Sequence, residues 1–138
     1  MTKEKLRVKN ITVNFEEKSI IEDVTITLNE GEIVSILGVS GVGKTTLFNV
    51  IAGLINPCIG TVELDGENII GKSGKISYML QKDLLFPFKT ILDNVSLPLI
   101  LKGENKKKAR EIAGKYLSQF GLEIMEIKYL IEFLKDIG

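Results

Sequence analysis

A glycine-rich stretch at residues 38–45 carries the residue types that hold phosphate groups. It reads Gly-Val-Ser-Gly-Val-Gly-Lys-Thr and matches the pattern G-x-x-x-x-G-K-[ST] at every fixed position. Glycines let the backbone curl until successive N–H groups point at phosphate oxygens. Lys44 adds a cation for the β- and γ-phosphates, and Thr45 adds a hydroxyl that binds Mg²⁺. The stretch therefore predicts a nucleoside triphosphate site formed by these residues: Gly38, Ser40, Gly41, Val42, Gly43, Lys44, Thr45 and Thr46.

The segments on either side of this loop decide whether it binds phosphate or is a turn without a ligand. Residues 33–37 are short, apolar and β-branched, which predicts a buried strand of a parallel sheet. Residues 44–54 place apolar side chains at helical spacing, and Gly53 and Pro57 mark the end of that helix. The positive end of the helix dipole then faces the loop, where it stabilises an anion. This strand–loop–helix context favours the phosphate site over the ligand-free turn.

Further strands and helices are expected around this unit. Apolar residues alternate at residues 6–15 and 20–28, and short apolar runs occur at 60–64 and 76–80; each predicts a strand. Residues 91–101 are apolar with a break at Pro98, and residues 106–120 have helical spacing that ends at Gly121. The order predicts an α/β protein with a β-rich beginning, the strand–loop–helix unit and then a helical part.

Composition narrows the classes of function. The chain has 138 residues, which suits one small domain, and its 18 basic residues balance its 18 acidic ones. This balance gives no electrostatic reason to expect a nucleic acid partner. The run of three lysines at residues 106–108 is expected to be a solvated helix face. A single cysteine, Cys58, excludes an internal disulfide framework, and no apolar run approaches the ~20 residues that span a bilayer.

The phosphate motif is shared by GTPases, small-molecule kinases, helicases and transporters, so the flanking residues must select the family. The loop, together with Thr46, Leu47 and the run Ile-Ala-Gly-Leu at 51–54, resembles the Walker A region of ABC transporter ATPases. Residues 6–15 resemble the opening strand of that family, and Phe15 stands where the family has an aromatic residue that stacks on adenine. The family usually has Tyr there, and Phe keeps the stacking face. Without the resemblance, Phe15 is simply an apolar strand end.

The resemblance continues after the helix. Residues 60–66 resemble the next β-hairpin of the family, and Ile-Ser-Tyr-Met-Leu-Gln at 76–81 resembles its Q-loop. This implies that Gln81 contacts Mg²⁺ and the attacking water, and that the segment after it contacts the membrane subunit. Without the resemblance, Gln81 is a polar residue at the end of an apolar strand. Within the family, residues 84–103 look most like the ATPases of nitrate, sulfonate and taurine-type importers.

The resemblance covers residues 6 to about 122 and implies both a fold and an activity. The fold is a P-loop NTPase of the ABC ATPase type, with an antiparallel β subdomain, a partial RecA-like core and the start of a helical subdomain. The activity is ATP hydrolysis with Mg²⁺ that drives import of a small solute, with an anion as the expected cargo. The partners are a transmembrane permease and, in the full-length form, a second copy. The subunit is expected in the cytoplasm, at the inner face of the membrane.

Three parts of the family pattern do not occur in this sequence. They are the signature of the Leu-Ser-Gly-Gly type, the Walker B strand that ends in Asp-Glu, and the switch histidine. The Walker B carboxylates would supply a Mg²⁺ ligand and the general base for water. Without them, we expect the chain alone to be inactive. The expected domains are residues 1–122, the first part of one ATP-binding domain, and residues 123–138, a tail of different character.

Two other classes of function stay open. One is a genuine short protein that binds nucleotide or the membrane subunit without catalysis; within this class, the chain could also be an inactive remnant of a longer protein. The other is a P-loop kinase or GTPase, which is disfavoured by Phe15, by Gln81 and by the missing Asn-Lys-x-Asp motif that reads guanine. A soluble, monodisperse chain would favour the short protein, and aggregation would favour the remnant.

The tail at residues 123–138 has two explanations. One is an amphipathic helix with Ile124, Ile127, Ile131 and Leu134 on one face. The other is a frameshift near Leu122, because codons for the tail permit a shifted-frame peptide that resembles the family's approach to its signature. We therefore predict that the shifted frame, downstream of the stop codon, encodes the signature, the Walker B strand and the switch histidine. Sequencing the coding DNA tests this, and a shifted frame without these motifs would reject the frameshift.

Overall fold

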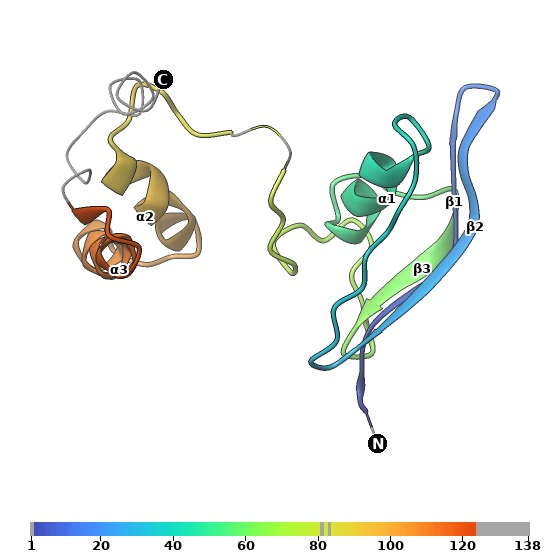
Figure 1. Ribbon diagram of the computed structural model, residues 1–138, viewed down its shortest axis with the longest axis horizontal. Helices are drawn as coiled ribbons and strands as arrows, with labels where there is room; N and C mark the ends of the chain where they lie inside the picture. The colour runs from blue at the N-terminus through green and yellow to red at the C-terminus, as the bar shows by residue number, and fades with distance from the viewer. Residues whose placement is uncertain (1, 81, 83, 124–138) are drawn as a thin grey trace. The chain divides into compact units, whose positions relative to one another are not determined.

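The computed structural model describes residues 2–80, 82 and 84–123, and the chain divides into two units (Figure 1). The first unit is Met1–Met79 and the second is Leu80–Gly138, and each is described by itself. Gln81, predicted as a Q-loop residue, lies outside the described residues, as does the tail from residue 124 onward.

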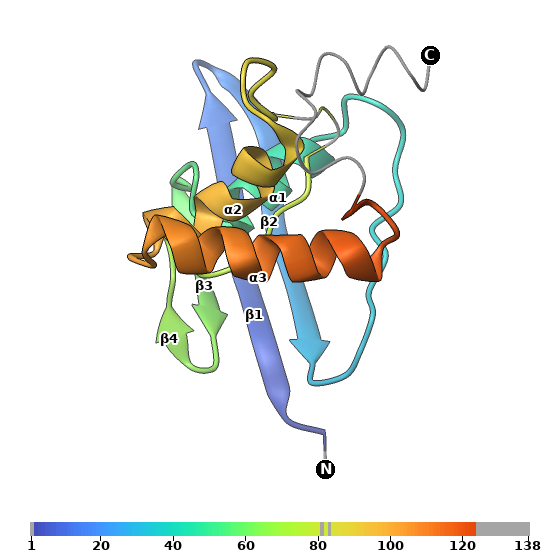
Figure 2. The same ribbon diagram turned by 90° about the vertical axis from the view of Figure 1, so that its left-hand side faces the viewer.

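The first unit is built on an antiparallel sheet with the strand order β2-β1-β3-β4. The strands are β1 (Glu4–Phe15), β2 (Lys18–Asn29), β3 (Ile59–Leu64) and β4 (Glu67–Asn68). β1 lies between β2 and β3, as Figure 2 shows. The strands predicted at 6–15, 20–28 and 60–64 are confirmed, because alternating apolar side chains place one face of each strand on a core.

Helix α1 (Lys44–Ile51) packs on this sheet through its apolar side. The shared core joins α1 to β1, β2, β3 and the chain after β4: Val8, Ile11, Val13, Ile21, Leu47, Val50, Ile51, Val62 and Ile69. Burial of a large aliphatic side chain contributes about 1.5–3 kcal/mol. Since Leu47 lies one turn from the start of α1, this core also holds the beginning of the helix in place.

Helix α1 is three residues shorter than the predicted 44–54, and Gly53 explains where it stops. Gly53 has a φ of +78°, and a Cβ added there would lie 2.5 Å from the carbonyl oxygen of Lys72. The loop around Lys72 and Ser73 therefore passes directly against the end of α1, and a residue with a side chain does not fit.

Two segments that we predicted as strands, residues 33–37 and 76–80, are not strands in the structure. Ile36 and Ile76 pack against the core, but Ile33 and Leu37 are 94% and 92% exposed. A buried parallel strand requires a hydrogen-bonded neighbour, and among the described residues no strand pairs with either segment. The prediction of a buried strand at 33–37 is therefore wrong for this structure, although its apolar pattern is real.

The second unit contains two packed helices, α2 (Ile91–Leu101) and α3 (Lys106–Gln119). Thr90 caps α2 by accepting from the Asp93 N–H at 3.1 Å, and Asn105 caps α3 by accepting from the Lys108 N–H at 2.8 Å. Their contact is apolar and consists of Ile91, Leu92, Ala113 and Leu117, with Leu122 packed beside them. The helix predicted at 106–120 is confirmed to within one residue.

The break expected at Pro98 does not occur, because α2 continues for three residues beyond it. Proline removes one N–H donor from the helix and its ring crowds the preceding turn. The carbonyl of Pro98 still accepts from the Lys102 N–H at 3.2 Å, so the last turn of α2 closes in spite of the proline.

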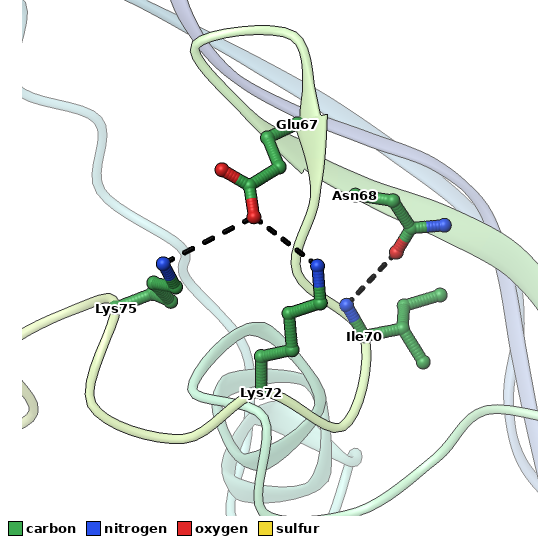
Figure 3. Close-up of polar contacts among 5 residues, drawn as sticks. All are labelled: Glu67, Asn68, Ile70, Lys72 and Lys75. Atoms are coloured by element: carbon green, nitrogen blue, oxygen red, sulfur yellow. Dashed lines mark hydrogen bonds and ion pairs between the residues drawn. The ribbon is translucent and has the colours of Figure 1, made fainter.

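A small set of polar contacts holds the chain after β4 (Figure 3). Glu67 forms ion pairs with Lys72 at 3.1 Å and with Lys75 at 4.0 Å. The side-chain oxygen of Asn68 accepts from the Ile70 N–H at 2.9 Å. The hydrogen bond from Lys72, together with the charges of Lys75 and Lys72, lowers the pKa of the Glu67 carboxyl below its ordinary value. These contacts hold the loop that packs on Gly53.

We predict that Glu67 titrates below its ordinary range in the folded chain and that Lys72→Met raises its pKa. A carboxyl with a lowered folded pKa stabilises the fold above the unfolded pKa of about 4.3, and this contribution is lost as the pH falls through the folded pKa. Carbon-detected NMR of the Glu67 carboxyl in both proteins measures the shift. Equal midpoints for Glu67 in both proteins would show that the ion pair does not form in solution.

Candidate nucleotide-binding site

The phosphate loop leads directly into α1, as predicted, and its glycines have the backbone angles that such a loop needs. Gly41 and Gly43 have φ values of +82° and +99°, in the region that side chains disfavour. Gly43 is the N-cap of α1 and offers no side-chain oxygen to the helix, and the first turn contains no acidic residue. The first N–H groups of α1 are therefore free of a competing anion from their own helix, which suits a bound phosphate.

Gly43 also fixes where the loop lies. A Cβ added at Gly43 would be 2.9 Å from the carbonyl oxygen of Ile20 and 2.6 Å from a methyl group of Ile21. Both residues belong to β2, so the start of α1 lies directly against the sheet. Ile20 and Ile21 were not among the predicted site residues, because no local pattern reveals which strand a loop glycine contacts.

Lys44 and Thr45 lie at the start of α1. The ammonium group of Lys44 donates to the carbonyl oxygen of Gly38, so its side chain folds back across the loop. Thr45 is exposed and Thr46 is half-buried, while Ser40 and Val42 are exposed on the loop. The eight predicted residues are thus continuous from the loop at 38–43 into the first turn of α1, which begins at Lys44.

Phe15 lies at the end of β1, where β1 turns into β2, and its side chain is 67% exposed. It pairs with Lys18 across the hairpin. Ile20, which contacts Gly43, is two residues from Lys18, and strands rise about 3.3 Å per residue. The backbone of Phe15 therefore lies roughly 7 Å along the strand direction from Ile20, which contacts Gly43. Phe15 and the two strand residues that Gly43 contacts thus belong to the same hairpin.

The chemistry of the loop fits a nucleoside triphosphate with Mg²⁺. Among the described residues there is no group of three or more His, Cys, Asp or Glu side chains that could hold a metal ion. Mg²⁺ commonly takes one or two protein oxygens and the oxygens of substrate phosphates, with water completing its shell. The hydroxyl of Thr45 supplies one such oxygen, and phosphates at the helix start would supply others. Gln81, the second predicted metal contact, lies outside the described residues.

The loop that precedes α2 is held by Asn94, a residue that we did not predict. Its side-chain NH₂ donates to the carbonyl oxygens of Phe86 at 3.0 Å, Lys89 at 3.4 Å and Thr90 at 3.0 Å. Its side-chain oxygen accepts from the Phe86 N–H at 2.7 Å. Asn94 is buried, and every polar atom of its side chain is used. The only sequence signal is an amide in a mainly apolar helix.

The loop held by Asn94 displays apolar side chains. Leu84, Leu85, Phe86 and Phe88 are all exposed, and the rings of Phe86 and Phe88 lie 5.6 Å apart at an angle of 49°. Exposed apolar side chains that are contiguous in sequence mark an interaction surface more often than isolated ones do. The segment that we predicted to contact a membrane subunit therefore has a defined shape.

The family of this chain follows from comparison with known sequences. The sequence profile described as "ABC transporter" matches residues 21–133. The chain belongs to the ABC transporter family. Solved ABC cassettes agree with this fold. One nucleotide-free ATP-binding cassette is 27% identical, with a TM-score of 0.79 over 94% of this chain and 58% of that chain. A dimeric cassette bound to ADP and phosphate is 29% identical, with a TM-score of 0.75 over 91% and 61% of the two chains.

The similar ABC proteins are ATP-binding proteins of import systems. The formylaminopyrimidine import ATP-binding protein ThiZ of Halalkalibacterium halodurans is 43% identical over 94% of this chain and 50% of its own length. The taurine import ATP-binding protein TauB of Escherichia coli K12 is 36% identical over 91% and 49%. The spermidine/putrescine import ATP-binding protein PotA of Fusobacterium nucleatum is 37% identical over 89% and 34%. The chain spans about half the length of the first two relatives.

We predict that Asn94→Ala loosens the loop before α2 in this ABC chain. The change removes all four side-chain hydrogen bonds, and lost bonds to partly buried backbone groups lower the free energy of unfolding by about 1–3 kcal/mol in total. Urea unfolding measures the loss, and hydrogen exchange should rise at residues 86–90 more than in α3. Asn14→Ala, an exposed position, is the matched control and should change stability by less than about 0.5 kcal/mol. Unchanged exchange at 86–90 would contradict the role of Asn94.

Proposed function

We propose that this chain binds ATP with Mg²⁺ as the nucleotide-binding part of an ABC importer subunit. The observation that carries this proposal is the glycine loop at the start of α1, where free helix N–H groups and the cation of Lys44 meet. The ATP phosphates would lie at the helix start, Thr45 would contact Mg²⁺, and adenine would stack on Phe15. The bound metal ion neutralises phosphate charge, and Lys44 adds a second positive charge.

The proposed partners follow from the family and from the second unit. None of the helices in the described part of the chain is long and apolar enough to cross a membrane. A permease subunit would bind the exposed loop that Asn94 holds, which follows Gln81 in sequence. In a complete cassette, Gln81 would contact Mg²⁺ and the attacking water, and two copies would assemble. The protein would then act at the cytoplasmic face of the membrane.

The transported solute is proposed only as a chemical class. The three relatives are named for three different solutes, formylaminopyrimidine, taurine and spermidine/putrescine, so overall similarity does not select one of them. The resemblance of residues 84–103 to nitrate, sulfonate and taurine-type ATPases supports a small anion. A non-catalytic protein that binds nucleotide is the second candidate.

We predict that Lys44→Ala weakens ATP binding at least tenfold. The change removes the charged group beside the β- and γ-phosphates and leaves the backbone N–H groups in place, and a tenfold loss corresponds to about 1.4 kcal/mol. Titration with a fluorescent ATP analogue measures the affinity of both proteins. Lys9→Ala, an exposed lysine on β1 that pairs with Thr61, is the matched control and should bind as the unchanged chain does. Equal affinity in the Lys44 variant would show that this loop is not the site.

We also predict that phosphate release by this chain stays at the level of its Lys44→Ala variant. The sequence contains neither the Walker B glutamate nor a switch histidine, and positioned acid–base groups contribute about 10²–10⁴-fold to a rate. A malachite green assay with Mg²⁺ and ATP compares the two proteins. Turnover on the order of 1 s⁻¹ that requires Lys44 would contradict this prediction and show that another group acts as the base.

A further inference from the structure

The turn between α2 and α3 concentrates positive charge at one end of the second unit. Four lysines occur within residues 102–108, with Glu104 as the one acid in that stretch. Lys102 follows the end of α2, and Lys106, Lys107 and Lys108 form the first turn of α3. All four lysines are exposed. Figure 2 shows how the turn joins the two helices, so these lysines share one end of the helix pair.

The position of these lysines opposes the stability of α3. The start of a helix carries partial positive charge, so cations there are unfavourable and acids are favourable. The first turn of α3 contains no acid. Glu104 pairs with Lys108 at 3.6 Å, and among the described residues Lys102, Lys106 and Lys107 form no ion pair. The lysines at residues 106–108 are exposed, as expected of a solvated helix face, although the helix dipole disfavours cations at this end.

An apolar side chain accompanies the charges. Leu101 is the last residue of α2, directly precedes Lys102, and is 77% exposed. A large apolar group beside several lysines is the composition of segments that lie on anionic membranes, where the apolar group enters the interface and the lysines meet lipid headgroups. Lysine suits this contact because its compact charge on a flexible stem needs no fixed partner geometry.

We propose that the α2–α3 turn binds the surface of an anionic lipid bilayer through Leu101, Lys102, Lys106 and Lys107. An acidic protein surface would also attract lysines, but charged protein contacts favour the planar fork of arginine, and the turn contains no arginine. The contact goes beyond the proposed binding of nucleotide and of a permease. It would add a weak second attachment next to the membrane, and paired weak attachments strengthen one another.

Flotation with lipid vesicles tests the proposal on the purified full chain without nucleotide. One set of vesicles is phosphatidylcholine, and the other has phosphatidylglycerol as a third of its lipid. We expect the chain to float with the anionic vesicles and to be released at high salt, which screens the attraction. Lys106→Gln with Lys107→Gln should lower the partition coefficient roughly 25-fold, about fivefold for each charge. Leu101→Ser should lower it by a smaller factor.

Lys115→Gln is the matched control, because it removes one exposed lysine from the middle of the same helix. Its partition coefficient should fall by less than about twofold, and circular dichroism should show equal helix content in all variants. Equal flotation with both vesicle types would overturn the proposal, as would equal losses for Lys115→Gln and for Lys106→Gln alone. If the unchanged chain binds no vesicles but still shows Lys44-dependent ATP binding, the lipid contact is rejected and the proposed function stands.

Discussion

The proposed nucleotide site depends on how closely the phosphate loop approaches β2. Because Gly43 has no side chain, its backbone lies against the carbonyl of Ile20, and α1 starts at that point. The helix is also held by Leu47 and Val50, which share a core cluster with Ile21 of β2. β2 in turn pairs with β1, whose last residue is Phe15. The spacing between the start of α1 and Phe15 is thus determined by antiparallel register, which is far stiffer than a loop.

Sequence could predict the parts of this site that neighbouring residues determine. The positive φ values of Gly41 and Gly43 and the helix that starts at Lys44 are local properties, and they occur where the motif placed them. Strand pairing is not local. Residues 33–37 are apolar on both faces, as buried parallel strands are, but a strand requires a neighbour that supplies hydrogen bonds. Within the described residues that neighbour does not exist, and the same argument applies to residues 76–80.

Asn94 shows a different limit of sequence reasoning. An amide inside an apolar helix can face solvent, or it can bind backbone groups nearby, and the sequence does not distinguish the two. Its partners lie four to eight residues earlier, across a turn whose shape Asn94 itself helps to determine. At Pro98 a strong local rule predicted a break, but α2 continues to Leu101.

The balance of 18 basic and 18 acidic residues also conceals two arrangements that differ in kind. Around Glu67, lysines surround an acid, lower the pKa of its carboxyl and hold a loop, so their charge is used within the fold. Around Lys106, lysines gather at a helix end whose own dipole repels them. Exposed charges act over only about 8–10 Å in physiological salt. The zero net charge of the chain therefore says little about the local charge around Glu67 or around Lys106. The same side chain stabilises the fold at one site and remains available to a partner at the other, and the backbone around it makes the difference.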